Sequence, residues 1–152
     1  MNTIELLRQS APNLASLIEN AGQSKLRRVA AVVARATVSR TGLSHPAVAQ
    51  ALERLETAPA PDADLQASVE AAAEALDEEY SALKELLEER EDAGKDDPDV
   101  NVAFSRARAA SAVAAALGDD EREAAASAAY EAVSATDDSE YLTEAVRRAL
   151  AI

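Results

Sequence analysis

The chain of 152 residues contains no cysteine, no tryptophan and a single histidine, His45. Without cysteine, disulfides, thiolate metal sites and a cysteine nucleophile are excluded. A catalytic triad needs a base beside its nucleophile, and His45 alone would have to fill every imidazole role. Because His45 directly precedes Pro46, we interpret it as a neighbour of a helix cap. We therefore expect a non-enzymatic protein with no catalytic residues and no cofactor.

Phosphate-binding and metal-binding patterns are also missing. No glycine-rich phosphate loop is present among only four glycines. The aspartates at 96, 97 and 99 lack the alternating ligands and central glycine of an EF-hand loop. A di-iron site would need Glu-x-x-His pairs on facing helices, which one histidine cannot supply. We expect no metal site.

Long apolar runs are absent as well. The longest uninterrupted runs, such as that from Val29 to Ala34, have six residues, whereas a membrane-spanning helix needs about 20 residues. The N-terminal residues Met-Asn-Thr-Ile-Glu-Leu-Leu-Arg lack the charged and apolar regions of a signal peptide. We expect a protein that does not enter a membrane and works in the cytoplasm.

Alanine is the most common residue of the chain, with 38 of the 152 positions. Alanine, leucine, glutamate and arginine are strong helix formers, and glycine and proline are scarce. The composition predicts an all-α fold of six or seven helices, as a compact bundle or a short two-layer helical array, with one long acidic amphipathic helix. The length fits a single domain over residues 1–152.

Glycine, proline and capping residues predict where the helices lie. Pro12 breaks or kinks a first segment over residues 3–19, and residues 57–61 form a linker at which a subdomain boundary would fall. The long helix is expected over residues 64–93, ended by Gly94. The other segments begin at Ser24, at Ser44, after Asp99, at Asp119–Asp120 and at Asp137–Asp138.

Charge is divided unevenly along the chain. Residues 1–57 carry seven Lys or Arg and four Asp or Glu, whereas residues 58–152 carry eight and twenty-four. The long helix concentrates this negative charge, which can steer a basic protein partner. We predict a partner-binding surface at Glu74, Asp77, Glu78, Glu85, Glu88 and Glu89. This favours a protein-binding module, in its most concrete form a small acidic inhibitor of the immunity-protein or antitoxin type. A solvated face typical of an acidic proteome is the alternative.

The segment from Thr41 to Glu56 carries a second hypothesis. Its Ser-His-Pro-Ala-Val string resembles the turn and second helix of bacterial helix-turn-helix proteins, in particular the Ser-x-Pro-Ala-Val string of LysR-type regulators. The resemblance implies a DNA-binding regulator. Its contacts would come from Arg27, Arg28 and Arg35 on phosphates and from Ser44, His45 and Gln50 in the major groove. The net charge of −13 makes a basic protein the preferred partner over nucleic acid.

Self-assembly is a third hypothesis. Apolar residues recur every three or four positions from Leu65 to Leu87, a stripe of about three heptads. Burial within one chain and pairing in a homodimer explain this stripe equally well. Four aromatic residues are expected to fill the core, with the tyrosine hydroxyls toward the surface: Tyr80, Phe104, Tyr130 and Tyr141.

Overall fold

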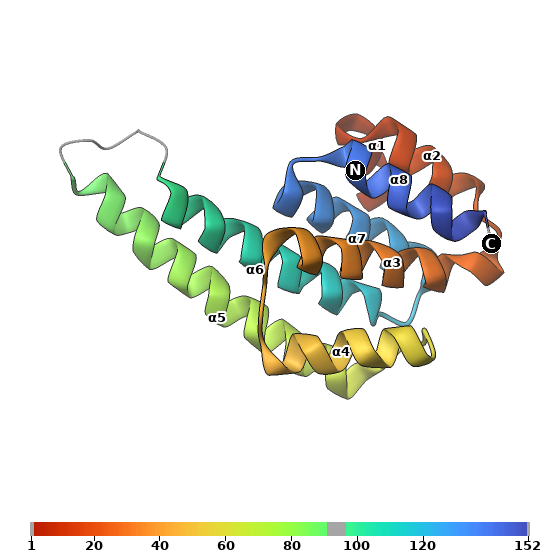
Figure 1. Cartoon of the computed structure of the whole chain (residues 1–152), viewed down its shortest axis with the longest axis horizontal. Helices are drawn as coiled ribbons and strands as arrows, with labels where there is room; N and C mark the ends of the chain where they lie inside the picture. The colour runs from red at the N-terminus through yellow and green to blue at the C-terminus, as the bar shows by residue number, and fades with distance from the viewer. Residues whose placement is uncertain (1, 91–96, 152) are drawn as a thin grey trace.

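The computed structural model describes residues 2–90 and 97–151. Within these residues the regular elements are eight α-helices and no strands (Figure 1). The helices are α1 (Thr3–Ser10), α2 (Pro12–Asn20), α3 (Gln23–Thr41), α4 (Pro46–Thr57), α5 (Ala63–Glu88), α6 (Pro98–Ala116), α7 (Glu121–Thr136) and α8 (Ser139–Leu150). The predicted all-α class is confirmed.

The described chain has more helices than the six or seven expected, because Pro12 ends one helix and begins another. Proline lacks a backbone N–H and favours the first position of a helix. It therefore begins α2, and Ala11 stands between α1 and α2 with a φ of −148° and a ψ of 73°, outside the helical range. A second expectation was wrong by two residues: α3 is capped by Gly22 and already includes Ser24.

Aspartate side chains fix the starts of α5 to α8. The N-cap residue of each of these helices is an aspartate that accepts a hydrogen bond from a backbone N–H of the first turn. In chain order these are Asp62, Asp97, Asp120 and Asp138. At the other end of α3, Gly42 adopts a left-handed conformation with φ of 70°, which a residue with a Cβ adopts only with strain. These caps set the lengths of the helices that carry the charged surfaces.

The long helix α5 ends at Glu88, five residues before the predicted end at position 93. Its last turn contains Glu85 and Glu88 and no basic residue. Negative charge near a helix C-terminus opposes the helix dipole, which favours an early end. The predicted stop at Gly94 lies in residues 91–96, outside the described part of the chain.

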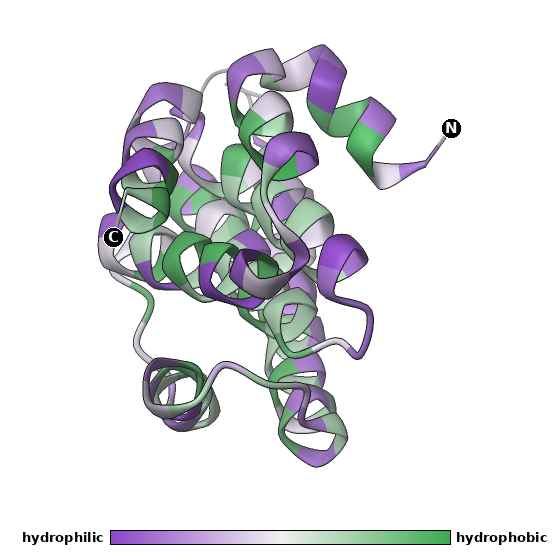
Figure 2. Ribbon diagram, turned by 90° about the vertical axis from the view of Figure 1, so that its right-hand side faces the viewer, coloured by the Kyte–Doolittle hydropathy of each residue, from purple (hydrophilic) through white to green (hydrophobic). Residues whose placement is uncertain are grey.

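The centre of the molecule consists of α3, α6 and α7, which pack against one another. The buried positions of α7 are all alanines, and those of α6 are alanines and Val113. Small side chains let helix axes approach closely. Hydrophobic residues gather between the helices in Figure 2. The larger buried side chains include those contributed by the flanking helices α1, α2, α4 and α8: Leu7, Leu14, Ile18, Leu55 and Leu142.

Two helices extend beyond this body. α5 and α6 pack along each other and run out together as a hairpin, away from the other six helices (Figure 1). The buried residues of α5 lie between Leu65 and Ala73, and those of α6 begin at Ala107. We call residues 78–90 and 97–106 the outer hairpin. None of these residues is buried.

Candidate functional site

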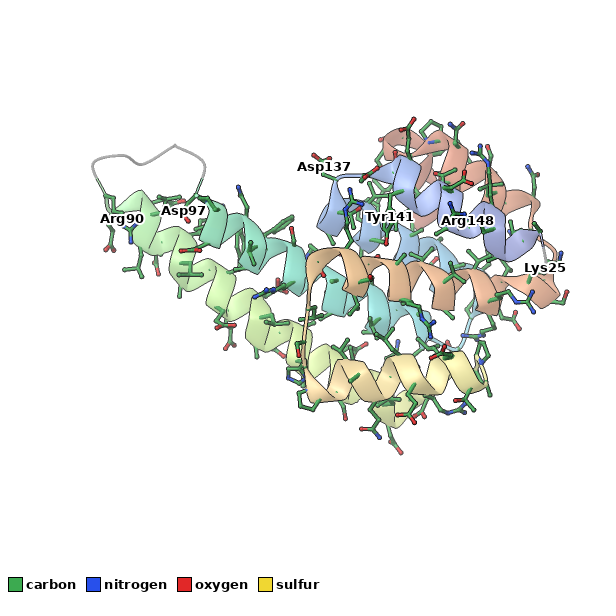
Figure 3. The ribbon with its side chains drawn as sticks, in the orientation of Figure 1. Lys25, Arg90, Asp97, Asp137, Tyr141 and Arg148 are labelled. Carbon is green, nitrogen blue, oxygen red and sulfur yellow. The ribbon has the colours of Figure 1, made fainter. Side chains whose placement is uncertain are left out.

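The outer hairpin is held together by a few contacts between its two helices. The ring of Tyr80 on α5 lies 5.3 Å from that of Phe104 on α6, centroid to centroid, within the range of favourable aromatic pairs. Lys84 Nζ lies 5.9 Å from the centre of the Tyr80 ring. Arg90 and Asp97 approach within 3.9 Å where the described parts of the hairpin end (Figure 3). All four aromatic residues are partly exposed. Tyr130 and Tyr141 pack against the core, whereas Tyr80 and Phe104 lie outside it on the hairpin, so the predicted core position is wrong for these two.

Large hydrophobic side chains are exposed on this hairpin. The exposed fractions are 36% for Leu83, 53% for Leu86 and 44% for Val102. Among the residues that the structure describes, these are the exposed large hydrophobic side chains, and all three belong to the outer hairpin. Exposed apolar groups gathered in one region are typical of an interaction site.

The sequence places Leu83 in the apolar stripe from Leu65 to Leu87, for which burial within one chain and pairing in a homodimer were both open, and it did not single out Leu86. One signal was available for Leu86, because it precedes Leu87 directly. Neighbouring residues point about 100° apart on a helix, so both side chains cannot face the same neighbouring helix. The exposure of Leu83 and Val102 had no such signal, since it depends on where the other helices stop.

The predicted acidic surface lies along α5, on the side of the helix that faces away from Leu83. Glu74, Glu78, Glu85, Glu88 and Glu89 are all exposed. Their spacing of four, seven, three and one residues places them on one side of the helix. None of them forms an ion pair with a described residue. We call these five residues the acid row.

Asp77, the sixth residue of the predicted surface, lies differently. It binds Arg108 of α6 with both carboxylate oxygens, at 2.7 and 2.8 Å. Arg108 also donates to Glu131 of α7 at 3.1 Å. Asp77 therefore links α5 to the body, and its charge is largely neutralised within the chain.

This ion-pair cluster shifts the pKa values of two of its members. Burial by itself lowers the pKa of Arg108, but the hydrogen bond to Asp77 and the charge of Glu131 outweigh it and raise that pKa. Burial raises the pKa of the Glu131 carboxyl, and Arg108 offsets this only in part. The cluster is thus a structural joint, with one carboxylate that is costly to ionise.

The basic residues of the DNA-binding hypothesis do not form one surface with the residues of the predicted turn. Arg27 donates to the backbone oxygens of Gly118 and Asp119, at the end of α6. His45 is the N-cap of α4, and its Nδ1 accepts a hydrogen bond from the N–H of Ala47. Gln50 lines a hollow between α4 and α5 with residues such as Asp64. Ser44 is exposed beside His45.

Arg28 and Arg35 instead line a groove on another side of the molecule, formed by α3, α4 and α8. The groove has a volume of about 540 Å³. Arg35 forms an ion pair with Glu56 of α4 across it. In Figure 1, α3 and α4 run in opposite directions, whereas the helices of a helix-turn-helix cross steeply. This arrangement weighs against DNA binding, which stays an untested hypothesis.

A hollow of about 350 Å³ between α5, α6 and α7 is lined by four carboxylates, those of Glu70, Glu74, Asp77 and Glu131. Among the described residues, however, no group of three or more His, Asp or Glu side chains has an arrangement that could hold a metal ion. Within the same residues, no helix combines the length and apolar character needed to cross a membrane.

Comparison with known proteins adds no relative. No family model matches the chain, and neither the curated proteins nor the solved structures include a significant match.

Proposed function

We propose that the protein is a non-enzymatic, cytoplasmic protein-binding module that docks on a basic partner through the outer hairpin. Its most concrete form is a small acidic inhibitor, of the immunity-protein or antitoxin type, that covers a basic surface of its target. One observation carries the proposal: Leu83, Leu86 and Val102 are exposed on a projecting hairpin, and its helix α5 also carries the acid row.

The apolar residues support a binding role because the outer hairpin cannot bury them itself. Val102 precedes Ala109, Val113 and Ala116 by seven, eleven and fourteen residues, so it shares their face of α6. Those three residues are buried, but the hairpin runs beyond the body before it reaches Val102. The core-facing side of α6 thus continues into solvent. A partner that covers it would gain about 25 cal/mol per Å² of apolar surface buried.

The acid row supports a basic partner. Five carboxylates on one side of a helix, none paired with a described residue, produce a local negative potential. Such a potential accelerates the approach of a positively charged surface and fixes its orientation. A row of this kind can occupy a surface that otherwise binds the phosphates of a nucleic acid. Occlusion of that surface is the inhibitory mechanism we propose.

The test compares capture of a partner from the lysate of the host by matched variants. One variant reverses the acid row by Glu74→Lys, Glu78→Lys, Glu85→Lys and Glu88→Lys, and a second carries Leu86→Ser and Val102→Ser. The control carries Glu53→Lys and Glu140→Lys, which reverse exposed charges away from the hairpin.

We expect the wild type and the control to capture the same stoichiometric basic protein, and both hairpin variants to lose it. With the purified partner, reversal of the acid row should slow association about tenfold or more at low salt and flatten its salt dependence. Capture that survives in both hairpin variants would show that the binding surface lies elsewhere.

A further inference from the structure

The basic side of the molecule is concentrated on α3. This helix carries Lys25, Arg27, Arg28, Arg35 and Arg40, and no carboxylate. Three of these five side chains already bind other groups of the same chain. Lys25 donates to the backbone oxygen of Leu150, and Arg27 caps the end of α6. Arg40 binds Asp138 at 2.8 Å and lies 4.6 Å from the centre of the Tyr141 ring.

The remaining two arginines stand at the groove between α3, α4 and α8. Arg28 forms no ion pair with any carboxylate that the structure describes, and Arg35 pairs only with the exposed Glu56. Apolar side chains line the groove between them, among them Val32, Leu52 and Leu55. The Tyr141 hydroxyl donates to the backbone oxygen of Ala36, which joins α8 to this side of α3 (Figure 3). The groove therefore combines an apolar lining with positive charge.

We propose that this groove binds the outer hairpin of a second copy of the same chain. The inference rests on the proposed function in one respect: it uses the same hairpin surface and names its occupant. Both halves of the contact are present in the molecule. The hairpin offers the exposed apolar side chains Leu83, Leu86 and Val102, and Glu89 follows Leu86 by three residues on the same side of α5. The groove offers apolar residues beside Arg28 and Arg35.

The contact has to form between two molecules. The hairpin extends away from the body that contains the groove, so it cannot fold back onto its own groove without breaking α5 and α6 (Figure 1). Opposite charges around an apolar contact favour one orientation and one partner surface. A basic partner of the proposed function would then compete with the second copy for the hairpin.

The first experiment measures the mass of the full chain by light scattering across protein concentrations, at low and high salt. We expect self-association that weakens at high salt. Arg28→Glu with Arg35→Glu in the groove, or Glu85→Lys with Glu89→Lys on the hairpin, should raise the dissociation constant at least about tenfold. Arg28→Glu alone serves as a milder groove variant, because Arg28 forms no described ion pair.

Two combinations of the charge reversals should restore self-association, which makes the test specific. A mixture of the groove variant and the hairpin variant should associate again, because each supplies the surface that the other lacks. A chain that carries all four reversals should also self-associate. Arg8→Glu with Arg122→Glu, at exposed positions of α1 and α7 away from the groove, is the control and should leave association unchanged.

Engineered cysteines then locate the contact, since the chain has none of its own. A Leu86→Cys chain mixed with a Ser39→Cys chain should form a mixed disulfide dimer, because Ser39 lines the groove. The same chain mixed with one carrying Ser16→Cys, an exposed position on α2, should form much less. Equal cross-linking at both positions would overturn the proposed site.

A wild-type chain that stays monomeric at every concentration, or a four-reversal chain that does not recover, overturns the inference. That result leaves the proposed function standing if capture of a foreign partner still depends on the hairpin. Conversely, self-association through the hairpin without capture of any other protein supports the inference and contradicts the inhibitor function.

Discussion

The two halves of α6 show how one helix can serve two different surroundings. From Ala107 to Ala116 its buried positions are alanines and Val113, covered by α3, α5 and α7. From Pro98 to Arg106 the same helix contacts α5 but has no buried residue, although this half contains the larger Val102 and Phe104. The difference follows from the number of layers around the helix and not from the size of its side chains.

The body and the outer hairpin also differ in how much their side-chain packing contributes to stability. In the body, close packing of small residues leaves little room for a change in side-chain volume. In the outer hairpin, the side chains already contact solvent, so truncation removes little buried surface. We therefore expect the body to determine folding stability and the outer hairpin to determine binding.

The largest contrast is expected between two leucines. Leu142 is fully buried in the body, whereas Leu86 is 53% exposed on the hairpin. Leu142→Ala should lower the free energy of unfolding by about 2–5 kcal/mol, and Leu86→Ala should change it by less than about 0.5 kcal/mol. Denaturant unfolding at high salt, where self-association is weakened, measures both. Similar losses in the two variants would contradict the division into a stable body and a binding hairpin.

A smaller contrast concerns added volume. Ala129 is fully buried in α7, and Ala82 is exposed on α5. Ala129→Leu should cost about 1–3 kcal/mol because it forces the closely packed helices apart. Ala82→Leu should leave the free energy of unfolding within about 0.5 kcal/mol of the wild type. If thermal and denaturant unfolding show that the body accepts the larger side chain without loss, the alanine interfaces are looser than the structure indicates.

The smallest effect is expected at the joint between the two regions. Burial raises the pKa of Glu131, so between the ordinary pKa of a glutamate, about 4.3, and the raised value the folded state binds more protons than the unfolded state. The contribution of Glu131 to stability therefore falls as the pH rises through this window. Glu131→Gln cannot titrate and lacks this dependence.

The measurement is the free energy of unfolding of the wild type and of Glu131→Gln at several pH values from about 4 upward. The difference, wild type minus variant, should decrease as the pH rises. Ser134→Ala, a change on the same helix that leaves the charge unaltered, is the control. Parallel pH profiles for the wild type and Glu131→Gln would show that Glu131 titrates alike in both states.

Local chemistry allowed most of the fold to be predicted. Pro12 interrupts a helix because proline has no N–H, and Gly42 ends one because glycine tolerates a positive φ. The predicted starts at Asp119–Asp120 and Asp137–Asp138 are confirmed, with Asp120 and Asp138 as the N-caps. The arrangement of the acid row could also be predicted from the sequence, since helical spacing alone places its residues on one side of α5.

Longer-range features could not be predicted in this way. Asp77 is an acidic residue on the same helix as the acid row, yet it binds Arg108, thirty-one positions away in the sequence. Arg28 and Arg35 were expected to act with Gln50, but they line a different hollow from it. Each of these outcomes depends on how helices distant in sequence are placed.

The sequence by itself determined the all-α class, most helix ends and the side of α5 that carries the acid row, because propensity, capping and periodicity act between residues a few positions apart. Only the tertiary structure decided that α5 and α6 extend beyond their neighbours, that Leu83, Leu86 and Val102 are exposed there, and that two arginines of α3 stand at an apolar groove. Exposure depends on which helices cover a face, and that is set by packing between segments far apart in the chain.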